Sequence, residues 1–456
     1  MHRQSDSMTG GSIWKSIVSF AVPLILGNFF QQLYNAADSL IVGNLLGDRA
    51  LAAVSGTGNL IFLLVGFING ISLGAGVVIS QQFGAGKIRD MRRSIHTLAA
   101  FGLASGLGLS IFGVLCTPQI LHWMNTPADV FPETLQYLRV YFAGALGLTT
   151  YNALASILQA VGNSRYPLYF LILSSVVNIV LDLVFIALLH WGVWSAAAAT
   201  VISQILSALL CTLVLCRSSA SWRLAPGSIR FHAGCLKTLA AYGFPSGLQC
   251  CVIGISNVVI QSHINLFGAS AMAGCGAYQK IEGFCLIPVM SLALALATFV
   301  GQNTGAHHPL RVRAGMSFGL VLSMLVSGLI GVGVLVWRDE LMAVFSADAE
   351  VIRLGADYAR VAAPFYVLPA CTHCLAAAFR GAGRPLFAMA VILICWCAVR
   401  VGTLSTLMSF FPTIATIYWI YPATWTLSSL TFLFAWWRMA SALRNGHKKA
   451  ATRGGR

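Results

Sequence analysis

Charged side chains are scarce in this sequence, whose 456 residues include only 13 aspartates and glutamates and 28 lysines and arginines. They make up 9% of the chain, against about 25% in a typical soluble domain. Apolar residues make up 57%, and apolar stretches of roughly 20 residues, enough to cross a bilayer, recur along the whole length. The scarcity of charge excludes a soluble globular domain and predicts many membrane crossings.

Motifs of other protein classes are missing as well. No G-x-x-x-x-G-K-[ST] occurs, because the stretch 84–87 (GAGK) lacks the upstream glycine and the following hydroxyl residue; this argues against an ATP-driven pump. The histidines show no HExxH or paired metal spacing, so we expect neither an enzyme nor a cofactor. The twelve cysteines lie mostly within apolar stretches, Cys371 and Cys374 inside one predicted span, which predicts buried thiols and no disulfide framework.

Basic residues give the chain a formal net charge of +15, but they are concentrated in alternate connectors and at the C-terminal end. This distribution follows the positive-inside rule for cytoplasmic loops and argues against nucleic-acid binding. It places both termini in the cytoplasm and requires an even number of crossings. We therefore predict a multi-pass protein of the bacterial inner membrane, whose partners are the lipid bilayer and small molecules, with no obligatory protein partner.

Twelve transmembrane helices are predicted, in two halves. The spans are 16–46, 51–81, 92–117, 133–161, 165–189 and 193–216, then 236–266, 271–302, 313–337, 351–381, 385–410 and 414–438. This gives an N-terminal lobe (1–216), a polar cytoplasmic linker (217–235), a C-terminal lobe (236–440) and a basic cytoplasmic tail (441–456).

The two halves resemble each other at a fixed offset of 221 residues. The offset pairs Gly47-x-x-Ala50 with Gly268-x-x-Ala271, Gln81-x-x-Gly84 with Gln302-x-x-Gly305, and Tyr137-x-Arg139 with Tyr358-x-Arg360. Since six helices return the chain to the side where it started, the two repeats have the same orientation. Parallel repeats of this kind are typical of transporters.

Acidic residues within the predicted spans are few, and they are candidates for function because charge in a membrane is costly. They are Asp38, Asp182 and Glu282, with Asp357 near a helix end. Asp182 lies nine residues before Trp191, at the turn between two helices, and Thr200 lies nine residues after it. At 1.5 Å rise per residue both lie about 13 Å from that turn. Asp38 lies at a similar depth on the first helix.

Asn178 is one helical turn from Asp182 on the same face, and Tyr141 reaches the same depth. Two carboxylates in a low-dielectric site require a counter-ion, which a proton or Na⁺ would supply. Glu282 is either a second coupling acid or the partner of Arg400 on the eleventh helix, and the sequence leaves both readings open.

Several stretches resemble a known family. The segment from Pro23 to Val54, QQFGAG at 81–86, LQAVGNSRYP at 158–167 and FVGQNTGA at 299–306 are together similar to MATE (multidrug and toxic compound extrusion) transporters. The resemblance covers residues 12–440. It implies a twelve-helix, two-lobed, V-shaped exporter of the MOP superfamily. Such a protein expels organic, often cationic amphipathic compounds in exchange for H⁺ or Na⁺.

The resemblance also implies residue roles. Coupling of the cation or proton falls on Asp38, Asn178, Asp182 and Thr200, the group that the depth argument assembles independently. Another branch of the family uses acids of the seventh and tenth helices; here the seventh has none and the tenth offers only Asp357, which disfavours a C-lobe site.

We further expect Pro23 to act as a hinge in the first helix. The residues expected to line the substrate cavity are Gln31, Gln32, Tyr34, Asn35, Tyr141 and Asn152. A flippase for a lipid-linked precursor, from the same superfamily, is the alternative function, although it would call for several basic residues in the cavity. The sequence identifies neither the substrate nor the coupling ion.

Overall fold

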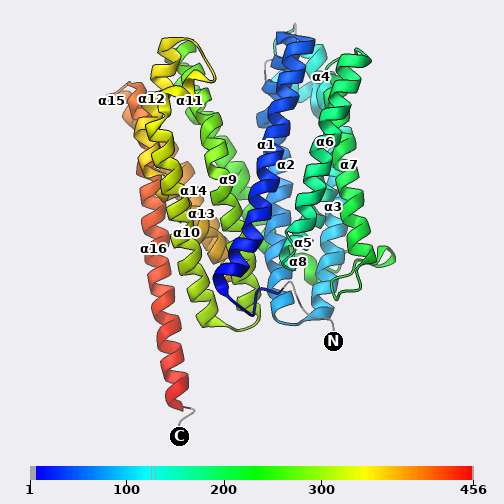
Figure 1. Cartoon of the computed structure of the whole chain (residues 1–456), viewed down its shortest axis with the longest axis vertical. Helices are drawn as coiled ribbons and strands as arrows, with labels where there is room; N and C mark the ends of the chain where they lie inside the picture. Colours follow the sequence, from blue (N-terminus) through cyan, green and yellow to red (C-terminus); the bar gives the residue numbers. More distant parts are fainter. Residues whose placement is uncertain (1–6, 125, 129, 454–456) are drawn as a thin grey trace. The chain divides into compact units, whose positions relative to one another are not determined.

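The computed structural model describes residues 7–124, 126–128 and 130–453, and every regular element in this part of the chain is helical (Figure 1). Nine of the described helices are long and apolar enough to cross a membrane, and one sharply bent pair provides a tenth candidate. The remaining two predicted spans correspond to helices at 131–160 and 414–453. The predicted all-α membrane fold is therefore confirmed.

The helices of the first half begin and end close to the predicted limits. They are α1 (Ile13–Leu46), α2 (Asp48–Gly84), α3 (Ile88–Trp123), α4 (Phe131–Ala143), α5 (Ala145–Ala160), α6 (Arg165–Asp182) with the π-helical turn η1 (Leu183–Leu188), and α7 (Trp194–Arg217). The predicted linker follows, with the short 3₁₀ turn η2 (Pro226–Ser228) inside it.

The second half repeats this order. Its helices are α8 (Ala233–Asn265), α9 (Ala269–Gly305), α10 (Pro309–Val336), the short α11 (Arg338–Ala343), α12 (Ala349–Ala362) with the 3₁₀ turn η3 (Ala363–Phe365), α13 (Val367–Gly381), α14 (Pro385–Leu393) with the π-helical turn η4 (Ile394–Val399), α15 (Arg400–Phe410) and α16 (Ile414–Arg453). The first six residues and residues 454–456 of the predicted tail lie outside the described part.

Two of the predicted spans are not single helices. The fourth is divided at Gly144 into α4 and α5, and the tenth is bent by 53° between the stretch Ala349–Phe365 and α13. Gly144 and Pro364 lie at the breaks, and both residue types weaken a helix, glycine by its backbone entropy and proline by its missing N–H.

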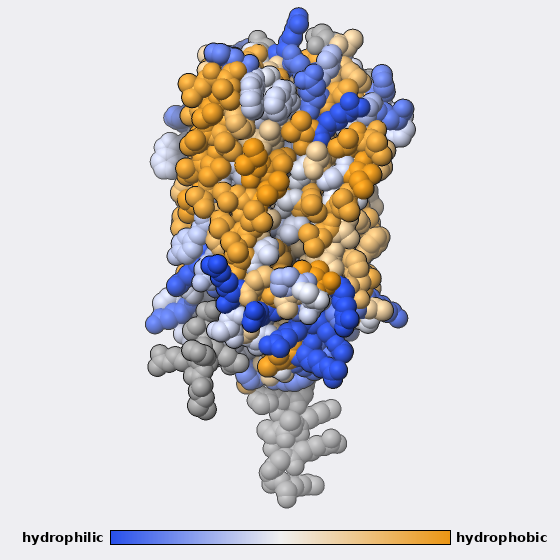
Figure 2. Space-filling model, turned by 90° about the vertical axis from the view of Figure 1, so that its right-hand side faces the viewer, coloured by the Kyte–Doolittle hydropathy of each residue, from blue (hydrophilic) through white to orange (hydrophobic). Residues whose placement is uncertain are grey.

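The surface of the helices is apolar along stripes that match one face of a helix. On α3, the side chains of Leu103, Leu107, Ile111 and Leu115 are four residues apart and 40–72% exposed. Figure 2 shows hydrophobic side chains in a broad band between two hydrophilic ends. Large apolar side chains that face outward over such a band indicate contact with lipid.

The backbone repeats at the same offset as the sequence. Glycines with positive φ precede α2 and α9, at Gly47 (87°) and Gly268 (89°). In the loops that follow those helices, Gly86 has φ 67° and His307 has φ 57°. The left-handed conformation is therefore kept in the second half although the glycine is replaced.

The chain forms two compact units. The first contains residues 22–250, and the second contains residues 7–21 together with 251–453. These limits fall inside α1 and α8, whereas the predicted boundary lies in the linker, so the division at 217–235 stays a prediction based on the repeat. Pro23 lies inside α1, one residue past the point where the chain enters the first unit.

Small residues bring the helices of the first unit close together. A Cβ atom on Gly106 of α3 would lie 2.2 Å from Oγ1 of Thr149 on α5, so only glycine fits there. The same Thr149 hydroxyl donates to the carbonyl oxygen of Gly102 at 2.9 Å. Close backbone approach through small residues is a usual device of membrane helices.

The segment before α1 is held in the second unit. The Met8 amide donates to Oε1 of Gln302 at 2.9 Å, and the side chain of Met8 is 4% exposed. Nη2 of Arg311 on α10 donates to the carbonyl oxygens of Met8 (3.1 Å) and Gly10 (3.0 Å), and Nη1 donates to that of Gly11 (2.9 Å). This network fixes the start of α1 to α9 and α10.

Candidate functional site

The four residues expected to couple the cation lie on three helices of the first unit. Asn178 and Asp182 are one turn apart on α6 and are 1% and 0% exposed. Nδ2 of Asn178 donates to Oγ1 of Thr200 on α7 at 3.4 Å. Asp38 on α1 is half-buried, and its carboxyl group lies within electrostatic range of that of Asp182. The structure thus brings all four side chains together, while their role stays a prediction.

Acceptor oxygens in this group have no protein donor. Oδ1 of Asp38, Oδ1 of Asn178 and both carboxyl oxygens of Asp182 are buried without a hydrogen-bond partner among the described residues. Buried polar atoms are normally paired, and an unpaired one costs about 1–3 kcal/mol. Three of these four oxygens belong to the two carboxyl groups and the fourth to an amide, and such a set of acceptors favours the binding of a small cation or a proton.

Two residues that the sequence analysis did not select lie at the same place. Tyr137 on α4 is 5% exposed and lies within electrostatic range of Asp38 and Asp182. Gln204 on α7 is also 5% exposed, its Oε1 atom is unpaired, and it neighbours Tyr34. Gln204 is one turn beyond Thr200, so the four-residue spacing used for Asn178 and Asp182 would also have found it.

The residues expected to line the cavity are only partly gathered around the acids. Tyr34 lies near Gln31 and both carboxylates, and Tyr141 stacks on Tyr137 with ring centroids 6.3 Å apart. Nδ2 of Asn35 donates to Oε1 of Gln32 at 3.2 Å on the exposed side of α1. Asn152 is half-buried on α5, where none of the described hydrogen bonds joins it to these residues.

The second unit holds Glu282 and Arg400, whose relationship the sequence left open. Glu282 on α9 is half-buried and interacts electrostatically with Arg400, which is 2% exposed. The ion pairs found within the described residues are Arg338–Asp339 (3.5 Å) and Arg353–Glu350 (3.7 Å), so Glu282 and Arg400 are within electrostatic range but not in direct salt-bridge contact.

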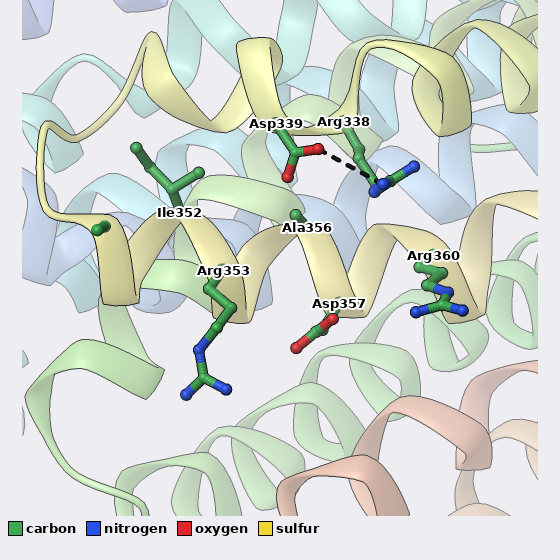
Figure 3. A pocket seen from close by; sticks show the side chains of 8 residues that line it. Arg338, Asp339, Ile352, Arg353, Ala356, Asp357 and Arg360 are labelled. Carbon is green, nitrogen blue, oxygen red and sulfur yellow. Dashed lines mark ion pairs between the residues drawn. The ribbon is translucent and has the colours of Figure 1, made fainter.

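Asp357 lies away from both of these places, in a separate pocket. Figure 3 shows it on α12 between Arg353 and Arg360, opposite the Arg338–Asp339 ion pair. The pocket has a volume of about 320 Å³. Three arginines, Arg338, Arg353 and Arg360, line the same pocket as Asp357. The absence of a coupling role for Asp357 stays a prediction.

No group of three or more histidine, cysteine, aspartate or glutamate side chains suited to a metal ion occurs in the described residues. A sodium ion at Asp38 and Asp182 would therefore use amide and hydroxyl oxygens, such as those of Asn178 and Thr200, besides the two carboxylates.

The fold and the buried carboxylates define the class: a multi-pass membrane protein built from two repeated six-helix sets, with unpaired acids in one of them. The MatE family model matches residues 23–184 and 245–404, and the chain belongs to this family.

Relatives along most of the chain carry related names. The probable multidrug resistance protein YpnP of Bacillus subtilis is 28% identical over 396 residues, which are 86% of this chain and 88% of that protein. The probable multidrug resistance protein NorM of Thermotoga maritima is 24% identical over 406 residues, 88% of this chain and 86% of the relative. Among solved structures, a MOP superfamily transporter from Pyrococcus furiosus aligns with a TM-score of 0.90 at 21% identity, over 96% of this chain and 98% of that one.

Proposed function

We propose that this chain is a secondary-active exporter that releases organic, often cationic amphipathic compounds in exchange for H⁺ or Na⁺. Membership of the MatE family and the multidrug names of its relatives support the substrate class. The observation that carries the coupling proposal is the Asp38–Asp182 pair: Oδ1 of Asp38 and both carboxyl oxygens of Asp182 are buried with no hydrogen-bond partner among the described residues. Such a pair of carboxyl groups requires a positive charge that can bind and leave, such as a proton or Na⁺.

The chemistry at the pair follows from electrostatics. Two neighbouring carboxylates in a membrane cannot both stay ionised without a counter-ion. A proton or Na⁺ from outside the cell binds between Asp38 and Asp182 and removes their repulsion. Oδ1 of Asn178 and the hydroxyl of Thr200 supply neutral oxygens beside them.

Export follows if the cation and the organic substrate prefer different conformations. Coupling can be only as large as that difference in binding. Asp38 lies on α1, and Pro23 removes one backbone hydrogen bond from the same helix. We infer that cation binding at Asp38 bends α1 at Pro23 and releases the substrate from a cavity lined by Gln31, Gln32, Tyr34, Asn35, Tyr141 and Asn152.

The proposed location in the cell rests on the apolar composition and on the distribution of loop charges. The protein resides in the inner membrane of a bacterium with both termini in the cytoplasm, as the loop charges indicate. It acts as a transporter and not as an enzyme. Its partners are small organic substrates and the coupling ion.

The test measures ethidium export in proteoliposomes under a pH gradient and, separately, a Na⁺ gradient. Wild type is compared with Asp38→Asn and Asp182→Asn. Asp357→Asn is the matched control, because it removes an acid that has arginine neighbours. We expect one gradient to drive export, both site variants to abolish it, and the control to retain it.

Two results would contradict the proposal. Export that survives Asp38→Asn and Asp182→Asn would place coupling elsewhere, with Glu282 the next candidate. No export under either gradient, across a panel of organic cations, would argue against multidrug transport and favour the precursor flippase.

A further inference from the structure

A guanidinium is enclosed in the second unit. Cζ of Arg400, at the start of α15, lies 5.0 Å from the ring centroid of Trp396 and 4.7 Å from that of Tyr421. Its Nε donates to Oγ1 of Thr424 at 3.0 Å, while its Nη2 is buried with no hydrogen-bond partner in the described part of the chain. Two aromatic faces thus hold a cation that water does not reach.

The aromatic wall around Arg400 is itself fixed. The Trp396 indole donates to Oγ of Ser428 at 2.9 Å, so its ring is held in place. Tyr421 lies 5.8 Å, centroid to centroid, from Tyr358. The ring centroids of Tyr358 and Tyr278 are 4.2 Å apart, with the ring planes tilted by 31°. A guanidinium in this enclosure has little freedom to leave it.

Glu282 is an acid within electrostatic range of this enclosure. It interacts electrostatically with Arg400 and with four tyrosines. These are Tyr278 of α9, Tyr358 of α12, Tyr366 directly after η3, and Tyr421 of α16. Lys280, two residues away, is exposed and lies over the ring of Phe345 at 5.8 Å. Arg400 is therefore the buried positive charge within electrostatic range of Glu282.

The repeat relates this enclosure to the site in the first unit. At the 221-residue offset, Tyr421 corresponds to Thr200, and Arg400 stands one residue after the position of Asn178. In both halves, hydrogen bonds between side chains join the fifth and sixth helices: Asn178–Thr200 in the first, and Arg400–Thr424 and Trp396–Ser428 in the second. The first half has two acids, Asp38 and Asp182, and neither forms an ion pair with another of the described residues; the second has one acid and a guanidinium.

We propose that Arg400 is a resident cation: its guanidinium occupies, in the second half, the place that the coupling cation takes in the first half, and it balances Glu282 permanently. A transported cation is then excluded from the second half, and coupling is confined to Asp38 and Asp182. This last step rests on the proposed function, whereas the pairing of Arg400 with Glu282 does not.

The first test is a double-mutant cycle on the melting temperature of purified protein in detergent. Arg400→Met removes the charge but keeps an apolar side chain, and we expect it to lower the Tm by about 5 °C or more, because it leaves Glu282 uncompensated. Arg400→Lys keeps the charge and should lose less. Glu282→Gln added to Arg400→Met should restore at least half of the loss. A double variant no more stable than Arg400→Met, or an Arg400→Met protein as stable as wild type, would overturn the pairing.

The second test asks whether the vacated place selects a cation. Arg400→Ala removes the atoms of ethylguanidinium, and ethylurea has a similar shape without the charge. The Arg400→Ala substitution is made in an Asp38→Asn, Asp182→Asn background, which removes the coupling site proposed for the first half. We expect ethylguanidinium to raise the Tm of this variant, ethylurea at the same concentration to have no effect, and Glu282→Gln to abolish the rescue. Equal effects of both compounds, or no effect of either, would overturn the resident-cation proposal.

The two proposals fail separately in these experiments. If Na⁺ or ethylguanidinium already raises the Tm of the Asp38→Asn, Asp182→Asn background with Arg400 intact, the coupling site proposed for the first half is wrong. If the background is insensitive and Arg400→Ala creates no cation response, the inference about Arg400 is wrong and the proposed function stands.

Discussion

Arg311 binds the backbone of Met8, 303 positions earlier in the chain, through an Nη2-to-carbonyl hydrogen bond of 3.1 Å. Its Nε also donates to Oδ1 of Asn303 at 3.0 Å, and Nδ2 of Asn303 donates to the same Met8 carbonyl at 3.2 Å. One arginine thus holds the start of α1 to the second unit.

Arg311→Ala is expected to destabilise the protein. It removes several hydrogen bonds from a charged group, each worth about 1.5–3 kcal/mol, and leaves the Met8 carbonyl with a single donor. The Tm in detergent should fall by several degrees. Arg313→Ala, on the same helix, is the control and should change the Tm by about 1 °C or less. Equal losses from the two variants would mean that Arg311 contributes only its surface charge.

Asn178→Ala tests the neutral oxygens of the proposed coupling site. Loss of the unpaired Oδ1 should weaken affinity for the coupling cation by about tenfold, while export at saturating cation stays close to wild type. The measurement is the cation dependence of ethidium export. Ser175→Ala is the control, since that hydroxyl donates only to the Leu171 carbonyl of its own helix. An unchanged cation affinity in Asn178→Ala would remove Asn178 from the site.

Tyr137→Phe tests a residue that only the structure points to. Its ring stays packed, but the hydroxyl beside Asp38 and Asp182 is lost. We expect the concentration of cation needed for half-maximal export to change by about 3–10-fold. Tyr166→Phe, whose exposed ring stacks on Phe170, should leave it unchanged. A Tyr137→Phe protein with wild-type cation dependence would limit this tyrosine to packing.

His307→Gly should stabilise the second unit. His307 holds φ 57°, which glycine adopts without steric cost, so the substitution should add roughly 0.5–1 kcal/mol to the free energy of unfolding. Gly86→Ala is the converse variant at the equivalent loop, where φ is 67°, and should lose about 1 kcal/mol. The two shifts in Tm should have opposite signs; shifts of the same sign would show that side-chain contacts outweigh the backbone term.

Helix limits were predictable from the sequence because polar connectors and apolar runs alternate sharply. The predicted span 271–302 and the observed α9, Ala269–Gly305, differ by three residues or fewer at each end. The interruption beside Pro364 was predictable, because proline removes a hydrogen bond from a helix. The break at Gly144 was not predicted, since glycine also occurs inside continuous membrane helices, as Gly106 does in α3.

Depth along a helix was also predictable, and it brought Asp38, Asn178, Asp182 and Thr200 to one level. Direction around the helix axis was harder to infer. In the sequence, Tyr137 is marked only by its match to Tyr358 in the repeat, which gives no direction for its side chain on α4. Glu282 and Arg400 stayed ambiguous, because distance along two helices does not say whether their side chains meet.

The clamp on Met8 has a consequence for biosynthesis. The amide of Met8 is bound by Gln302, which is translated 294 residues later. At about 5–20 residues per second, the ribosome reaches that partner roughly 15–60 s after Met8 has been made. The opening segment of the nascent chain must therefore remain undocked until well over half of the protein has been synthesised, and fusing a rapidly folding domain directly in front of it should lower the yield of correctly assembled transporter.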